Sequence, residues 1–278
     1  MSSNPLRQFF RQPAAYIRLP SDGKYYPKDT VVIPENREFP VYPMTAIDEI
    51  TYRTPDALFN GTAVVNVIHS CVPNIKNAWA IPSTDIDTIL VAIRMASYGN
   101  EIDLDSTCPA CQNEMNFQYD LRTVLDRLKA GDYTKPLRFG DLEIFLRPMN
   151  YKELNDNNAS QFEEQRIIQQ LPDSDLPDNE KLQRLNESMK KITALSIKIV
   201  AQSVGAIRTP ESLVQEPNFI MEFLTNCPSN TFNAIRDHAI ELKAAGELQP
   251  IPISCNACQH EYKQTMTLDM VNFFAPAS

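Results

Sequence analysis

Glycine, histidine and the signature patterns of common enzymes are scarce in this sequence. The chain of 278 residues contains seven glycines and three histidines but 21 prolines. It has neither a G-x-G-x-x-G nor a Walker-type G-x-x-x-x-G-K-[ST] motif, so loops that cradle phosphate are not expected. It also lacks the G-x-S-x-G and H-E-x-x-H patterns and the His-x-Glu element of zinc deaminases. We therefore expect no enzymatic activity and no small-molecule substrate.

The sequence also has few basic residues relative to acidic ones and no long apolar run. The 26 lysines and arginines are outnumbered by 35 aspartates and glutamates, which gives a formal net charge of -9 and a pI near 4.9. This balance disfavours a broad basic surface, so nucleic acid is not the expected main partner. No apolar run approaches the roughly 18 residues that cross a bilayer, and the polar start of the chain does not resemble a secretory signal. We expect a protein that folds in the cytoplasm, with no membrane partner.

Cysteine is sparse, but its spacing is informative. Six cysteines are too few to hold a fold of this size together with disulfides, and four of them form the C-x-x-C pairs Cys108–Cys111 and Cys255–Cys258. A C-x-x-C turn presents two sulfurs to one ion, and a second such turn completes a tetrahedron. Four thiolates leave no open position for a reacting water, so these residues predict a structural zinc site.

Other interpretations of these cysteines stay open. Each pair could be redox-active, although the flanking extended segments differ from the helix start that carries a thioredoxin-type pair. All four could be plain thiols, or each pair could bind its own zinc with an unidentified partner such as His260. Iron is an alternative to zinc in a four-cysteine site. The remaining Cys71 and Cys227 follow apolar stretches, and we expect both in the core.

Two segments of the chain repeat the same short motifs in the same order. The first contains Pro43-Met44, Arg53-Thr54-Pro55-Asp56, Cys71, Gly99 and Cys108–Cys111, and the second contains Pro148-Met149, Arg208-Thr209-Pro210-Glu211, Cys227, Gly246 and Cys255–Cys258. In both, the first paired cysteine follows the glycine by 9 positions. A helix is predicted before each glycine, the first with Ser83 as its N-cap, and extended segments flank each C-x-x-C. We infer a duplication whose second copy carries an insertion of about 50 residues.

These patterns predict an α+β fold with two duplicated, mixed helix–strand lobes joined by a four-cysteine zinc ribbon. The first lobe covers residues 36–135 and the second covers residues 136–278. The insertion, at about 155–205, is predicted to be a helical hairpin, because apolar residues recur at helical spacing on both sides of the breaker Pro172–Asp178. Each lobe then contributes one C-x-x-C turn to a shared ion.

Residues 1–35 lie outside the repeats and are rich in proline. Because proline at this density prevents a helix, we expect an extended N-terminal arm that docks on the body or on a neighbouring protein. Apolar and aromatic side chains lie between the prolines, and they predict interface anchors at Tyr16, Leu19, Tyr25 and Tyr26.

Three motifs in the first 60 residues carry a family resemblance. They are residues 17–26 (IRLPSDGKYY), residues 39–45 (FPVYPMT) and residues 53–58 (RTPDAL). With these motifs the chain resembles the baseplate protein family of T4-like contractile-tailed phages, whose members are baseplate hub subunits or hub assembly proteins. The resemblance is clearest over residues 17–121 and extends more weakly through the second Pro-Met and C-x-x-C copies.

The resemblance implies a structural subunit that joins or organises the central hub of a tail baseplate. Its partners would be other hub or wedge proteins, and it would move from the host cytoplasm during assembly to the baseplate of the virion tail. One alternative is an assembly chaperone for the hub that is absent from the mature virion. A second alternative is a zinc-ribbon adaptor that binds nucleic acid.

Overall fold

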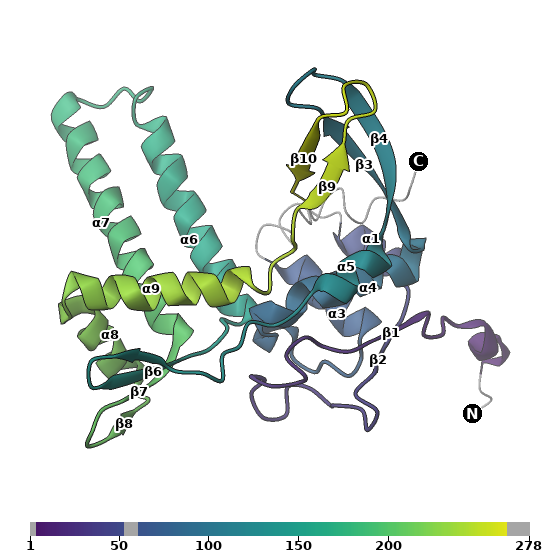
Figure 1. Cartoon of the computed structure of the whole chain (residues 1–278), viewed down its shortest axis with the longest axis horizontal. Helices are drawn as coiled ribbons and strands as arrows, with labels where there is room; N and C mark the ends of the chain where they lie inside the picture. The colour runs from purple at the N-terminus through teal and green to yellow at the C-terminus, as the bar shows by residue number, and fades with distance from the viewer. Residues whose placement is uncertain (1–3, 53–60, 266–278) are drawn as a thin grey trace. The chain divides into compact units, whose positions relative to one another are not determined.

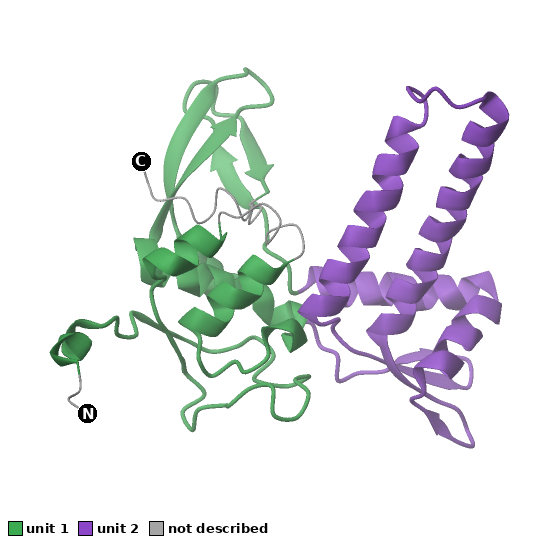
Figure 2. Ribbon diagram, turned by 180° about the vertical axis from the view of Figure 1, so that it is seen from behind, with its two compact units in different colours: residues 1–130, 246–278 green, residues 131–245 purple. Residues whose placement is uncertain are grey.

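The computed structural model describes residues 4–52 and 61–265, and it divides the chain into two compact units. One unit combines residues 1–130 with residues 246–278, and the other comprises residues 131–245 (Figure 2). Both mix helices with small antiparallel sheets, so the predicted α+β class is confirmed. The repeat motif at residues 53–56 lies outside the described residues. Within the described part of the chain, no helix is both long and apolar enough to cross a membrane.

The first unit is built around the helix α4 (Ser83–Tyr98), most of whose residues are buried. It ends as predicted at Gly99, whose φ of 91° suits a residue without a Cβ. Its N-cap is Pro82 rather than the predicted Ser83, and no side chain caps this end. The same unit contains β1 (Ala15–Ile17), β2 (Phe39–Val41), α1 (Ala46–Tyr52), α3 (Thr62–Cys71), η2 (Ala78–Ala80) and α5 (Leu121–Arg127), and η1 (Pro5–Phe9) lies apart from them near the N-terminus (Figure 1).

Two hairpins complete the first unit, and they come from distant parts of the sequence (Figure 1). Strands β3 (Glu101–Thr107) and β4 (Glu114–Asp120) form one, and β9 (Ile251–Ser254) and β10 (Glu261–Gln264) form the other. The predicted second lobe therefore differs from the observed unit, because residues from 246 onward group with the first unit. The reason is that the late hairpin packs against the early one.

Much of the N-terminal segment docks on the body of its own unit. Strand β1 pairs antiparallel with β2, and the backbone of Val31 forms a bridge with Ile75. The backbone N–H of Ser21 and its hydroxyl both donate to the buried carboxylate of Asp85, at 2.8 and 2.5 Å. The arm is not extended throughout, because it contains the 3-10 helix η1 and turns at residues 20–25 and 28–30. From residue 14 to residue 32 it packs on its own unit.

The second unit contains a four-stranded antiparallel sheet in the order β5 (Leu137–Phe139), β6 (Leu142–Leu146), β7 (Val204–Arg208) and β8 (Leu213–Val214). The helices α8 (Pro217–Asn226) and α9 (Ser229–Ala244) complete its core, where Ile144 and Ile235 are fully buried. The two helices predicted within the insertion are α6 (Tyr151–Gln170) and α7 (Asp178–Ser203). The predicted breaker lies between them except for its last residue, Asp178, which begins α7.

Helices of equal length occupy matching places in the two repeats. Helices α3 and α8 both have 10 residues, and α4 and α9 both have 16. Both 16-residue helices have a proline at the N-cap, Pro82 and Pro228, and each is followed by a strand that leads to a C-x-x-C turn. The order of elements in the two repeats therefore agrees with the order of the motifs in the sequence.

Candidate metal centre and an arginine network

The two C-x-x-C turns have the same backbone geometry. In the first, Cys108 N–H donates to the Asn113 carbonyl at 3.0 Å, and Gln112 N–H donates to the Cys108 carbonyl at 2.9 Å. In the second, the corresponding bonds from Cys255 to His260 and from Gln259 to Cys255 are both 2.9 Å. The turn folds its two cysteines onto one side of the hairpin tip, as a metal knuckle requires.

A glutamine adopts the left-handed conformation in each turn. Gln112 has a φ of 58° and Gln259 has a φ of 60°, a region that side chains with a Cβ adopt at a cost of roughly 1–2 kcal/mol. Glycine is common at this place in such turns. Both turns therefore require a left-handed residue directly after the second cysteine, and a glutamine adopts that conformation in each.

The four sulfur atoms lie together, and the shortest distances join one turn to the other. Cys108 Sγ is 3.7 Å from Cys258 Sγ, and Cys111 Sγ is 3.6 Å from Cys255 Sγ. All four ligand atoms lie within 4.8 Å of one another. A tetrahedral ion with metal–sulfur bonds of about 2.3 Å has sulfur–sulfur edges of about 3.8 Å. The donor set therefore fits one ion shared by both hairpins.

Further contacts hold the two hairpins against each other beside the cysteines. Asn113 Nδ2 donates to Asn256 Oδ1 at 2.9 Å, and the Ser106 hydroxyl lies 2.6 Å from the Tyr262 hydroxyl. The Ser106 hydroxyl also donates to Gln264 Oε1 at 2.9 Å. The cysteines are thus positioned by a polar interface between segments about 150 positions apart in sequence, rather than by their own turns alone.

The cysteine environments favour coordination over free thiols. Cys108 and Cys255 are buried, whereas Cys111 and Cys258 are exposed. Backbone N–H groups of Cys258 and Ala257 donate to the Cys255 sulfur and lower the pKa of its thiol to about 6. The pKa of the Cys111 thiol is lowered by the backbone of Asn113 but raised by the neighbouring cysteine sulfurs, to about 12 overall, so the spacing of the four sulfurs carries the assignment. With all four positions filled by sulfur, no site is left for a substrate or an activated water. The chemistry that these residues support is structural.

The competing interpretations of the cysteines fit the geometry less well. A redox pair needs its two sulfurs close to each other, but the shortest sulfur–sulfur distances run between the pairs. Both pairs sit between strands and not at a helix start. His260 stacks on Tyr262, with ring centroids 6.2 Å apart, and is not part of the sulfur cluster. Cys71 is fully buried, as predicted, and burial raises the pKa of its thiol to about 12.

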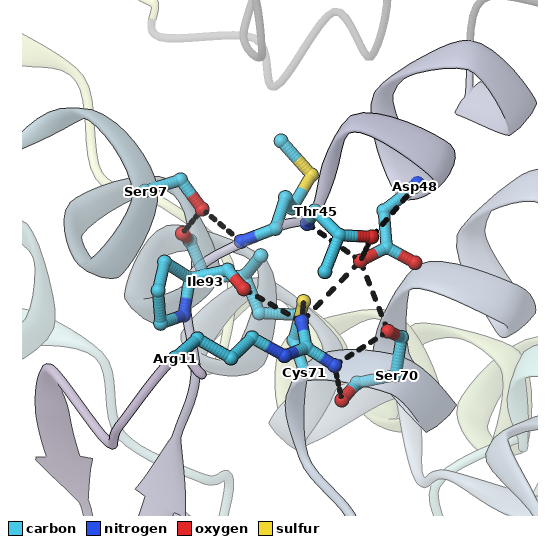
Figure 3. Close-up of polar contacts among 9 residues, drawn as sticks. Arg11, Thr45, Asp48, Ser70, Cys71, Ile93 and Ser97 are labelled. Atoms are coloured by element: carbon cyan, nitrogen blue, oxygen red, sulfur yellow. Dashed lines mark hydrogen bonds and ion pairs between the residues drawn. The ribbon is translucent and has the colours of Figure 1, made fainter. Parts of the chain in front are cut away.

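Sequence reasoning missed a polar network that anchors the N-terminal segment (Figure 3). The Arg11 guanidinium donates to the Pro43 carbonyl at 2.6 Å and to the carbonyl and hydroxyl of Ser70, both at 2.8 Å. It also lies 3.3 Å from Asp48 Oδ2, which accepts hydrogen bonds from the Thr45 backbone N–H and hydroxyl and from the Ser70 hydroxyl. Arg11 thus joins the arm to α1 and α3.

The second repeat contains a comparable device after its own Pro-Met motif. Asn150 and Glu153 exchange the two hydrogen bonds of a capping box, both at 2.9 Å, as Thr45 and Asp48 do at the start of α1. The two terminal nitrogens of the Arg147 guanidinium, Nη1 and Nη2, donate to the Glu153 carboxylate at 3.0 and 2.6 Å. In the second repeat the arginine, Arg147, directly precedes the Pro-Met motif. In the first repeat the corresponding arginine, Arg11, comes from the N-terminal arm. The sequence signal that could have located both capping boxes is the Thr/Asn-x-x-Asp/Glu pattern directly after each Pro-Met motif.

The four predicted interface anchors lie in different environments. Leu19 is buried in the first unit at 5% exposure, so it serves this chain's own core. Tyr26 is half-buried, and burial together with the neighbouring Asp85 raises the pKa of its hydroxyl. Tyr16 and Tyr25 are exposed. Three further exposed apolar side chains, which sequence reasoning did not select, lie nearer the N-terminus at Leu6, Phe9 and Phe10.

Comparison with known proteins gives one match. The family model described as T4 bacteriophage base plate protein matches residues 26–275, which is most of the chain. No curated protein and no solved structure shows a significant match. The matched range contains both Pro-Met motifs and all four clustered cysteines, and it begins after the segment that carries Arg11.

Proposed function

Because the chain belongs to the T4 bacteriophage base plate protein family, we propose that it is a structural, non-enzymatic subunit of a contractile-tail baseplate. The family match is the observation that carries this proposal. The subunit joins or organises the central hub through contacts with other hub or wedge proteins. It assembles in the host cytoplasm and then resides in the baseplate of the virion tail.

A structural zinc ion clamps the fold of this subunit. The sulfur cluster and its tetrahedral spacing support this part of the proposal. Because the two hairpins belong to the two sequence repeats, the ion ties the last segment of the second repeat to the first unit. We propose that the repeats arose by duplication, and the equal helix lengths and matched turns support that origin.

The N-terminal segment supplies a main contact with the neighbouring subunit. Leu6, Phe9 and Phe10 are 61%, 76% and 55% exposed in and next to η1, and Tyr16 is 62% exposed. Arg11 holds this apolar stretch to the body, so it is presented at a fixed place. Tyr16 and Tyr25 are the two predicted anchors whose exposure suits this role.

Incorporation into particles tests the proposal. Phages whose own copy of the gene is inactivated are supplied with either the full chain or a chain lacking residues 1–10, and purified virions are analysed by mass spectrometry. We expect the full chain in the virion and the truncated chain outside it. Truncation stops before Arg11 because later residues are part of the folded body. Incorporation of the truncated chain at normal copy number would refute the contact assignment.

The same particles distinguish the alternatives. An assembly chaperone is present in infected cells and missing from purified virions, whereas a structural subunit is present in both. A nucleic-acid adaptor would bind DNA or RNA with an affinity that falls steeply with salt. We expect no such binding, because the acidic residues outnumber the basic ones by 35 to 26.

A further inference from the structure

The guanidinium of Arg11 lies in a pocket of the first unit, the arginine pocket, which is formed by Tyr42, Pro43, Asp48 and Ser70 (Figure 3). The guanidinium donates to the carbonyls of Pro43 and Ser70, to the Ser70 hydroxyl and to the Asp48 carboxylate. Its carbon lies 5.8 Å from the centre of the Tyr42 ring. Several acceptors in different directions beside an aromatic ring suit the flat, five-donor guanidinium better than a compact ammonium.

The arginine pocket is ordered by hydrogen bonds that do not involve the arginine. Asp48 Oδ2 accepts from the Thr45 backbone N–H and hydroxyl, both at 2.8 Å, and from the Ser70 hydroxyl at 2.9 Å. The Asp48 side chain is 11% exposed, whereas the Arg11 side chain is 27% exposed. The carboxylate is therefore held in place by its own neighbours, while the arginine that binds it stays in contact with solvent.

The segment that carries Arg11 is attached to the body at few points. From residue 4 to residue 10 every residue is exposed, and the hydrogen bonds of this stretch are local. Arg11 is the first described residue whose hydrogen bonds reach the body, and backbone pairing begins at Ala14, whose N–H donates to the Val41 carbonyl at 2.9 Å. Arg11 is therefore the polar anchor of this stretch, and it enters the pocket as a side chain on an otherwise exposed segment.

The second repeat holds an arginine in the same arrangement but supplies it from a different place in the chain. Arg147 donates to the carbonyl of Pro148 at 3.4 Å and to the carboxylate of Glu153, as Arg11 does to the proline and the acid of the first repeat. Arg147 directly precedes its Pro-Met motif, and the residue at that position of the first repeat is Tyr42. Arg11 comes instead from 32 positions before the proline. The arrangement therefore selects the guanidinium and not the chain path that delivers it.

We propose that the arginine pocket is a binding site for an arginine on an extended segment of another protein, and that Arg11 fills it in the free chain. Because Arg11 is tethered beside the pocket, its effective concentration there is on the order of millimolar, so an arginine in free solution seldom displaces it. A neighbour docked on the exposed N-terminal segment holds its own arginine at a comparable effective concentration and exchanges with Arg11. The pocket does not depend on the proposed baseplate role, which only suggests where a neighbour comes from.

Binding of a labelled peptide to the full chain, measured by fluorescence anisotropy, tests the inference. The peptide has the sequence of residues 8–14 (QFFRQPA), and a second peptide carries Arg11→Lys. In the chain, Arg11→Ala empties the arginine pocket. The matched control is Arg18→Ala, which removes another arginine of the arm, whose 72% exposed side chain pairs with Glu38 outside the pocket. Circular dichroism checks that both variants fold.

We expect the arginine peptide to bind Arg11→Ala at least about tenfold more tightly than it binds the wild-type chain or Arg18→Ala, whose pockets are filled by their own Arg11. The lysine peptide should bind Arg11→Ala at least about threefold more weakly, because an ammonium lacks the planar fork. Equal binding to the three chains, or equal binding of the two peptides, overturns the proposal. So does the absence of binding to Arg11→Ala at about 5 mM peptide, which exceeds the effective concentration of the tethered arginine.

A second measurement decides the case even if Arg11→Ala folds poorly. N-Ethylguanidinium contains the atoms that this substitution removes, and propylammonium is a cation of similar size without the planar fork. At equal concentrations, N-ethylguanidinium should raise the unfolding temperature of Arg11→Ala, relative to the wild-type chain, more than propylammonium does. An equal effect of the two cations on Arg11→Ala would show that the pocket does not recognise a guanidinium and would overturn the proposal.

Discussion

Removal of the metal should unfold the late hairpin while the second unit stays folded. Between Ile251 and Gln264 only Ile251 and Cys255 are buried. Burial of one isoleucine stabilises the folded segment by about 3 kcal/mol. Ordering the backbone of its 14 residues costs at least about 14 kcal/mol of conformational entropy. The difference is similar to the roughly 10 kcal/mol that a structural zinc site supplies. We therefore expect the hairpin to depend on the proposed ion.

Hydrogen exchange, measured with and without a strong chelator, checks this dependence. We expect amides in β9 and β10 to lose protection when the metal is removed, together with the tips of β3 and β4. Amides of the second unit, residues 131–245, should keep their protection. Cys255→Ser should reproduce the loss, whereas Cys227→Ser, which changes a half-buried cysteine outside the cluster, should not.

The reasoning would be refuted by protection that survives in residues 251–264 after complete metal removal. Metal content is measured on the same samples, so that an incomplete removal is recognised. The comparison of the two serine variants separates loss of a ligand from loss of a thiol.

Two further predictions concern the way the N-terminal segment is held. Arg11→Ala should lower the free energy of unfolding by about 2 kcal/mol, because the buried Asp48 and the half-buried Ser70 lose a charged donor, and Arg11→Lys should recover only part of it. Thermal unfolding that is equal in all three proteins would contradict this. Burial raises the pKa of Asp85 to about 6, so the folded state binds a proton that the unfolded state has already lost. Stability from this group is present below pH 4 and falls as the pH rises to 6, and denaturant titrations should show that Asp85→Asn removes this part of the pH dependence; an unchanged profile would contradict the assignment.

The features that were predictable from sequence are those set by local patterns. Apolar residues at helical spacing located α6 and α7, and proline placed the break between them. Gly99 ended α4 because the position has a positive φ. The C-x-x-C spacing and the alternation around it placed Cys108 and Cys255 in hairpin tips, since these signals depend only on neighbouring residues.

Features set by contacts between distant segments were not predictable in the same way. The second unit ends near residue 245 because the late hairpin binds the early one through side chains such as Asn113 and Asn256. Nothing local to either hairpin specifies that pairing. Nothing in the residues around Leu19 distinguishes a buried side chain from an exposed anchor, yet Leu19 is buried, between strand β1, which pairs with β2, and Ser21, which is bonded to Asp85. The sequence around Arg11 does not distinguish it from the other arginines, because its partners Asp48 and Ser70 come from α1 and α3.

The central claim is that four cysteines from two distant segments hold a single ion. X-ray absorption spectroscopy of the full chain, purified without chelator, tests it most directly. We expect one zinc per chain, surrounded by four sulfurs at about 2.3 Å and by no nitrogen or oxygen. A chain without bound metal, or a shell in which nitrogen or oxygen replaces any of these sulfurs, would contradict it.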